Sequence, residues 1–218
     1  MPLLLTRQSP VMGIWKSTEP WQDMLESFRN KEIYSHDVLK IQSDKRKQEW
    51  LAVRLLLKHL SGSETPISYH DNGAPFLCDS PYHISISHTV GYAAVILSKN
   101  PNPGIDIEYR SERAWKLRHK YMGKKEQEMF TLLCGDKQTG DEKHSGQTTL
   151  ATVCWCAKET AYKALRKTEV DFIEHLHVLP FTLFEKGNFL LKETKTSKQE
   201  VFNIHYQITE DFIITWKE

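Results

Sequence analysis

The sequence predicts an α+β protein made of two similar halves, each with a small antiparallel sheet packed on one long helix. Apolar residues recur at helical spacing over two stretches, Asp44–Leu60 and Leu150–Lys167. Alternating segments typical of strands accompany each helix. The run Pro101-Asn102-Pro103-Gly104 interrupts both patterns. We therefore expect a first lobe over residues 1–102 and a second lobe over residues 103–218.

The remaining elements follow from alternation and turn signals. Strands are expected at Val11–Lys16, Tyr82–His88, Tyr92–Leu97 and Ile105–Tyr109, with a three-segment antiparallel meander between Phe181 and Trp216. Shorter helices are expected at Ala114–Tyr121 and Lys124–Cys134. The stretch Gly135–Thr149 has three glycines and no apolar residue, so it predicts an exposed, mobile loop.

The composition excludes several classes of protein. The formal net charge of the 218 residues is +1, so no overall field favours nucleic acid or a membrane surface. No apolar run approaches the roughly 18 residues of a membrane span, and the N-terminus lacks the pattern of a signal peptide. No cysteine pair has C-x-x-C spacing, and Cys154 and Cys156 are expected to be buried thiols. A cytoplasmic protein is expected.

Asp106 and Glu108 are the first candidate functional pair, in Gly104-Ile105-Asp106-Ile107-Glu108. On a strand, residues two apart share a face, so both carboxylates point the same way while the isoleucines enter the core. Two adjacent carboxylates repel unless a cation lies between them. Mg²⁺ suits such a pair, because it takes one or two carboxylates and leaves other positions to water and phosphate. The alternative is an exposed strand edge with two solvated acids.

A second candidate set lies in the long helix of the second lobe. Glu159 and Lys163 are four residues apart and share a helix face, Lys158 adds a second ammonium, and Trp155 can pack this end of the helix on the core. The alternative for Glu159 and Lys163 is a surface salt bridge, which contributes little to stability.

Two further groups could bind an anion. Ser87 and His88 end a predicted strand, where hydroxyls, backbone N–H groups and an imidazole can form an anion cradle. The first long helix aligns Lys47, Arg54 and Lys58 along one line, with Arg46 near its start. The alternatives are a polar strand end and the solvated face of an amphipathic helix.

Taken in order, these motifs resemble one family. The sequence runs through Asn72-Gly73-Ala74-Pro75, Ile86-Ser87-His88, Gly104 to Glu108, and Trp155 to Lys163. This order resembles the 4′-phosphopantetheinyl transferases, and the chain length resembles the longer, pseudo-dimeric type that activates surfactin synthetase. The resemblance covers roughly Lys45 to Lys163. It implies two lobes related by pseudo-two-fold symmetry and a site drawn from both, for which a monomer suffices.

The resemblance also implies an activity. The family transfers 4′-phosphopantetheine from coenzyme A to a serine of an apo acyl or peptidyl carrier protein and releases 3′,5′-ADP. By this resemblance Asp106, Glu108 and Glu159 are the magnesium ligands, with manganese as an alternative ion. Glu159 is also the base for the carrier serine, and Lys163 stabilises charge on the pyrophosphate or the departing ADP. The implied coenzyme A contacts are Arg46 (for the 3′-phosphate), Arg54, Gly73, Pro75, Ser87, His88, Lys158 and Lys163.

One position departs from the family pattern. Ala74 stands where the family often has a basic residue, and Lys47 is a candidate to replace that contact. Two other functions stay open from the residues: a non-catalytic protein that binds coenzyme A or a nucleotide, and a Mg²⁺-dependent phosphohydrolase. The sequence does not choose among carriers of fatty-acid, polyketide or nonribosomal peptide synthesis.

Overall fold

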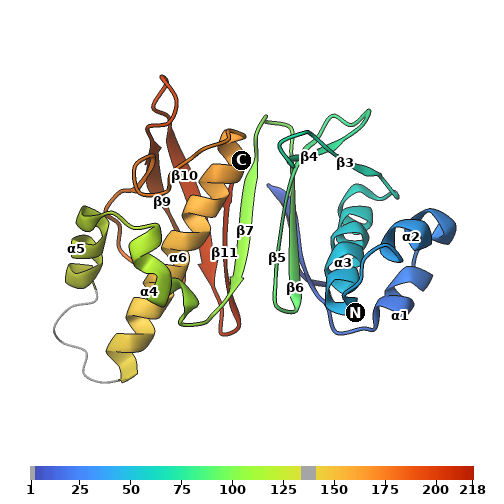
Figure 1. The fold of residues 1–218 in the computed structure, drawn as a ribbon, viewed down its shortest axis with the longest axis horizontal. Coiled ribbons are helices and arrows are strands. Elements are labelled where there is room, and N and C mark those ends of the chain that lie inside the picture. The colour runs from blue at the N-terminus through green and yellow to red at the C-terminus, as the bar shows by residue number, and fades with distance from the viewer. Residues whose placement is uncertain (1–2, 134–140) are drawn as a thin grey trace. The chain divides into compact units, whose positions relative to one another are not determined.

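A computed structural model describes residues 3–133 and 141–218. The chain forms two compact units (Figure 1). The N-terminal unit runs to Ile105 and includes Glu218, and the C-terminal unit is Asp106–Lys217. Both contain helices and antiparallel strand pairs, which confirms the predicted mixed α/β class.

The N-terminal unit is a four-stranded antiparallel sheet covered by one long helix. The sheet has the order β1-β2-β6-β5, and every neighbouring pair is antiparallel. The helix α3 packs against β2 and β6. A separate hairpin, β3–β4, and two short helices complete the unit. The bounds are β1 Leu3–Gln8, β2 Val11–Lys16, α1 Trp21–Glu26, α2 Lys31–Val38, α3 Asp44–Ser61, β3 Ile67–Tyr69, β4 Pro75–Leu77, β5 His83–Thr89 and β6 Tyr92–Ser98.

The residues at the two ends of α3 explain where this helix starts and stops. The Ser43 side chain accepts a hydrogen bond from the Arg46 backbone N–H at the N-terminus. Gly62 takes a left-handed conformation after the last turn, with φ of 76°. At Gly13 in β2, an added Cβ would lie 2.7 Å from Leu56 Cδ1, so the glycine lets α3 approach the sheet closely.

The C-terminal unit repeats this plan with a five-stranded sheet in the order β7-β11-β10-β9-β8. The long helix α6 packs against β8, β9, β10 and β11 (Figure 1). The predicted meander is confirmed, since β9, β10 and β11 pair antiparallel. The bounds are β7 Gly104–Tyr109, α4 Arg113–Leu117, the 3₁₀ helix η1 Arg118–Lys120, α5 Lys124–Leu133, α6 Asp141–Leu165, β8 Leu176–Val178, β9 Lys186–Glu193, β10 Val201–Ile208 and β11 Phe212–Lys217.

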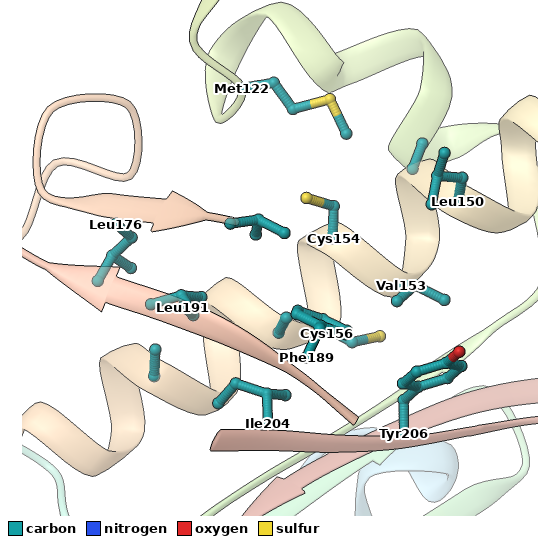
Figure 2. Close-up of a cluster of buried hydrophobic side chains, with 14 of the residues drawn as sticks. Met122, Leu150, Val153, Cys154, Cys156, Leu176, Phe189, Leu191, Ile204 and Tyr206 are labelled. Carbon is teal, nitrogen blue, oxygen red and sulfur yellow. The ribbon is translucent and has the colours of Figure 1, made fainter. Parts of the chain in front are cut away.

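The core of the C-terminal unit lies between α6 and its sheet. Figure 2 shows Cys154 and Cys156 on α6 among apolar side chains such as Met122, Leu191 and Tyr206. Both thiols are at most 1% exposed, which confirms that they are buried, and burial raises the pKa of each. They serve packing rather than chemistry.

The prediction of a loop over Gly135–Thr149 is wrong for its second part. The helix α6 begins at Asp141, nine residues before the predicted start, and it ends at Leu165. Residues 134–140 lie outside the described residues. Polar residues extend a helix whose later turns are buried, since each added residue contributes one more backbone hydrogen bond without needing an apolar face. Thr149 is held in place by Arg110, whose Nη2 donates to Thr149 Oγ1 over 2.9 Å.

Several short elements were not predicted. They are β1, α1, α2, the β3–β4 hairpin and β8. All are three to eight residues long, so they contain too few repeats for a clear period. The predicted helix at Ala114–Tyr121 is divided into α4 and η1. No described helix has the length and apolar character needed to cross a membrane.

Candidate active site

The strand β7 supplies two carboxylates to the candidate site. Ile105 and Ile107 are buried, as the alternating pattern predicts, and the side chains between and after them are Asp106 and Glu108. Asp106 is itself only 5% exposed, whereas Glu108 is half-buried. The solvated strand edge considered above therefore does not describe Asp106.

The helix α6 places three more side chains against these carboxylates. Trp155, Glu159 and Lys163 follow one another at intervals of four residues along one face. Lys163 Nζ donates to Asp106 Oδ1 over 2.8 Å. Trp155 Nε1 donates to Glu108 Oε1 over 3.0 Å. These two contacts fasten the helix to the strand, and Glu159 lies on the helix between the two side chains that make them.

The electrostatic environment of Glu159 differs from that of an ordinary surface acid. Burial raises its pKa, and the nearby charge of Asp106 raises it further. Lys163 lowers it and Glu108 raises it, and the result is a pKa of about 7. Three carboxylates therefore lie near enough to repel one another, with one ammonium to offset them. We call Asp106, Glu108, Glu159 and Lys163 the carboxylate site.

The donor chemistry of the carboxylate site fits a hard divalent cation. Carboxylate oxygens are the ligands that Mg²⁺ prefers, and mutual repulsion among three of them favours a bound positive charge. Within residues 3–133 and 141–218, however, no three acidic, histidine or cysteine side chains are arranged as a ready metal centre. In this structure the positive charge beside Asp106 is the Lys163 ammonium. The carboxylate site therefore fits a divalent cation by the chemical type of its ligands and not by a preformed arrangement of them.

The prediction that Lys158 binds the cofactor does not agree with the structure. Its side chain is fully buried, and Nζ donates to three acceptors: the carbonyls of Tyr121 at 2.6 Å and Phe172 at 2.8 Å, and Glu126 Oε2 at 2.7 Å. An ammonium has three N–H groups, so all of them are used. Lys158 directly precedes Glu159 in the motif but points into the core, where it holds α6 to its surroundings.

Glu126 completes the environment of Lys158. Its Oε2 also accepts from the Gly123 backbone N–H over 2.9 Å, and its Oε1 accepts from that of Val178 over 2.8 Å. This carboxylate therefore joins α5, α6 and β8 inside the protein. We call Lys158 and Glu126 the buried pair.

In the N-terminal unit, the structure brings Arg46 and His88 together. Arg46 Nη1 lies 2.6 Å from His88 Nε2, and because guanidinium only donates, this imidazole nitrogen accepts. Glu49 Oε2 accepts from the same Nη1 over 2.8 Å and lies 3.5 Å from His88 Nδ1. Arg46 and His88 are exposed, as an anion site requires, whereas Ser87 is buried.

The other predicted contacts of the N-terminal unit lie elsewhere in it. Arg54 lies 3.3 Å from the centre of the Trp50 ring and donates to the Trp50 carbonyl, and burial lowers its pKa. Gly73, with φ of 78°, and Pro75 belong to the β3–β4 hairpin. Lys47 is a poor replacement for a basic residue at position 74. Its Nζ lies over the Trp21 ring at 4.5 Å and 3.2 Å from Asp44 Oδ1.

Three contacts at these sites were not predicted from the sequence. The Trp155 hydrogen bond to Glu108 was missed, although Trp155 shares a helix face with Glu159. Glu49 lies three residues after Arg46, a spacing that could have indicated the contact. Nothing in the sequence near Glu126 indicates that it pairs with a lysine 32 residues later.

A comparison with known protein families gives a match that covers most of the C-terminal unit. A family model described as the 4′-phosphopantetheinyl transferase superfamily matches residues 102–216, just over half of the chain. The matched range includes both β7 and α6, and hence the whole carboxylate site. No curated protein matches this chain at a significant level.

Proposed function

Since the chain belongs to the 4′-phosphopantetheinyl transferase superfamily, we propose that it transfers 4′-phosphopantetheine from coenzyme A to a serine of an apo acyl or peptidyl carrier protein. The observation that supports this most is the carboxylate site itself. Two direct contacts between β7 and α6 bring three carboxylates and one ammonium to one place within the matched range.

In the proposed reaction the nucleophile comes from the carrier. The serine Oγ forms a bond to the phosphorus that bears pantetheine, the pyrophosphate P–O bond breaks, and 3′,5′-ADP leaves. Glu159 accepts the serine proton, and Lys163 neutralises charge on the pyrophosphate oxygens. Such a transfer depends on positioning and charge neutralisation rather than on a covalent enzyme intermediate. This agrees with the buried, inert thiols of Cys154 and Cys156.

Asp106, Glu108 and Glu159 would hold a magnesium ion, or manganese in its place. When bound, such an ion supplies a Lewis acid and a template for the pyrophosphate. Trp155 contributes by fixing one oxygen of Glu108. The indole has a single N–H, so the direction of this bond is not ambiguous.

We assign the anionic end of coenzyme A to the N-terminal lobe. Arg46 and His88 are exposed and adjacent, and a phosphate there would compete with Glu49 for the Arg46 guanidinium. Arginine suits phosphate because its fork matches two oxygens at once. We propose two lobes, residues 1–102 and 103–218, with the carboxylate site in the second. We also propose that the protein acts as a monomer in the cytoplasm.

The direct test is intact mass measurement of an apo carrier protein after incubation with coenzyme A, Mg²⁺ and this protein. We expect the carrier to gain one phosphopantetheine group and the gain to stop when a chelator is added. A control without carrier distinguishes a transferase from a phosphohydrolase, because only the latter would consume coenzyme A alone. No mass gain with a panel of fatty-acid, polyketide and peptide carriers would contradict the proposal.

A further inference from the structure

An acid lies inside the anion site proposed for the N-terminal lobe. Glu49 follows Arg46 by three residues on α3, the long helix of the N-terminal unit in Figure 1. Its Oε2 accepts from Arg46 Nη1 over 2.8 Å and lies 3.5 Å from His88 Nδ1. One carboxylate therefore contacts both side chains that the proposed function gives to the anionic end of coenzyme A.

The arginine and the acid of this group differ in exposure. The side chain of Glu49 is 13% exposed, and that of Arg46 is 58% exposed. Glu49 and His88 use both N–H groups of Arg46 Nη1. Among the residues that the structure describes, Nη2 and Nε of Arg46 have no hydrogen-bond partner. An anion can therefore bind these remaining N–H groups while Glu49 stays on the other side of the guanidinium.

Glu49 weakens the attraction between this group and an anion. Like charges repel, and solvent screens a largely buried carboxylate less than an exposed one. Over residues 3–133 and 141–218, the cations at ion-pair distance from Glu49 are Arg46 and, when it is protonated, His88. A phosphate on Arg46 therefore shares the positive charge that balances Glu49.

A helix surface pair alone does not account for this arrangement. Arg46 and Glu49 could pair along α3 without any other element, and such pairs contribute little to stability. His88 lies on β5, 42 residues after Arg46, and its ring contacts both members of the pair. The three side chains are thus gathered around one guanidinium from two elements of the unit.

A weakened anion site has a use in the proposed reaction. Coenzyme A and the product 3′,5′-ADP carry the same 3′-phosphate, so a group that binds this phosphate holds substrate and product alike. Binding that is equal in both does not speed the chemical step, and release of a tightly held product often limits turnover. An acid beside Arg46 lowers the affinity for both molecules.

We propose that Glu49 holds down the affinity for the 3′-phosphate and thereby promotes release of 3′,5′-ADP. This inference rests on the proposed function and gives a role to an acid that takes no part in the chemical step. Glu49 acts through Arg46, because the carboxylate and the phosphate share the same guanidinium. Removal of its charge should therefore strengthen binding of the product.

Binding is the first test, because it needs neither a carrier protein nor turnover. The probes are 3′,5′-ADP and 5′-ADP, which differ only in the 3′-phosphate, and the readout is isothermal titration calorimetry in Mg²⁺. The isosteric Glu49→Gln should bind 3′,5′-ADP about tenfold more tightly and 5′-ADP within twofold of the unaltered protein. The matched control is Asp44→Asn, which removes an exposed acid of the same helix that pairs with Lys47, and it should stay within twofold for both nucleotides.

A double variant tests whether the effect passes through Arg46. Arg46→Gln should weaken binding of 3′,5′-ADP, and adding Glu49→Gln to it should change that affinity by less than twofold. An undiminished effect of Glu49→Gln without the arginine would overturn the proposal. Equal or weaker binding of 3′,5′-ADP by Glu49→Gln, or an equal gain for both nucleotides, would also overturn it.

Transfer kinetics distinguish a failure of this inference from a failure of the proposed function. With enzyme in excess, the first turnover of Glu49→Gln should match that of the unaltered protein within twofold. Its steady-state kcat should fall about fivefold and its inhibition constant for 3′,5′-ADP about tenfold. Transfer with an unaltered kcat or inhibition constant would contradict the role of Glu49 alone. The predicted change in nucleotide binding without any transfer would support the effect of Glu49 on the anion site and contradict the proposed transferase.

Discussion

Two lysines of α6, five residues apart, occupy opposite kinds of environment. Lys158 is completely buried, and its ammonium is fixed by Glu126 and two carbonyls. Lys163 has a side chain that is 26% exposed and pairs with Asp106. Five residues correspond to about 140° around a helix, so the two side chains leave on different faces. One motif therefore contains a fully buried structural lysine and a partly exposed lysine that pairs with Asp106.

The surroundings of two nearby acids, Glu126 and Glu159, differ in the same way. Every oxygen of Glu126 accepts a hydrogen bond from a lysine or a backbone N–H, so its charge is compensated inside the protein. Glu159 instead lies among other carboxylates, and its pKa rises to about 7. A satisfied buried charge stabilises the fold, whereas a crowded and incompletely compensated set of charges favours binding of a cation or a proton.

The largest effect should come from breaking the buried pair. Lys158→Met leaves Glu126 buried without its counter-charge, and we expect the free energy of unfolding to fall by about 3–5 kcal/mol. Chemical denaturation measures this directly. The exposed Lys167→Met is the matched control and should change stability by less than about 0.5 kcal/mol. Comparable losses in the two variants would remove the contrast between the lysines.

Lys163→Met should reduce activity strongly and stability only slightly. We expect transfer to fall by about a hundredfold or more, because charge stabilisation at the reacting phosphate is lost. The free energy of unfolding should fall by only about 1 kcal/mol, since this lysine is partly solvated. Steady-state transfer rates and denaturation of the same preparation test both statements. A folded variant with full activity would show that Lys163 is only a surface partner of Asp106.

Glu159 should make stability depend on pH. Its pKa is about 7 in the folded protein and 4.5 in its ordinary state. A raised pKa means that the folded state binds the proton more tightly. The resulting stabilisation is complete below pH 4.5 and is lost as pH rises through 7. The free energy of unfolding of the unaltered protein, relative to that of Glu159→Gln, should therefore fall by on the order of 2 kcal/mol between pH 5 and pH 8.

The difference in free energy of unfolding between the unaltered protein and Glu159→Gln is measured by chemical denaturation in EDTA, which removes divalent ions. The exposed Glu185→Gln is the control, and its stability should follow that of the unaltered protein across the range. A constant difference between Glu159→Gln and the unaltered protein from pH 5 to pH 8 would show that the carboxylates are not crowded.

The smallest effect is expected at Trp155. Trp155→Phe removes the donor to Glu108 but keeps an aromatic ring against Tyr121 and Phe172. We expect stability to fall by about 1 kcal/mol and transfer to fall roughly fivefold to tenfold. Trp115→Phe is the control, because Trp115 contacts Arg118 instead of the carboxylate site. Unchanged transfer in Trp155→Phe would mean that Glu108 does not need this contact.

The sequence predicted those parts of the fold that repeat a strong pattern. The long helix that begins at Asp44, the strand that contains Asp106 and the meander were predicted because the residue periods and the turn signals agree there. The start of α6 was missed because polar residues have no apolar period to detect, and short elements such as β3 offer too few repeats.

The candidate site was predictable where spacing alone places side chains together. Glu159 and Lys163 share a face because they are four residues apart. Lys158 was wrongly predicted to bind the cofactor, because it is adjacent to Glu159 in sequence. Glu159 lies at the carboxylate site, whereas Lys158 points into the core. Its partner Glu126 is 32 residues away in sequence, and only the packing of α5 on α6 reveals the pair.

We propose above all that the carboxylate site performs phosphopantetheine transfer. The most direct measurement is the intact mass of an apo carrier protein after incubation with coenzyme A, Mg²⁺ and either the unaltered protein or Glu159→Gln. We expect complete modification by the unaltered protein and none above background by the folded variant. Modification at the same rate by Glu159→Gln would contradict it.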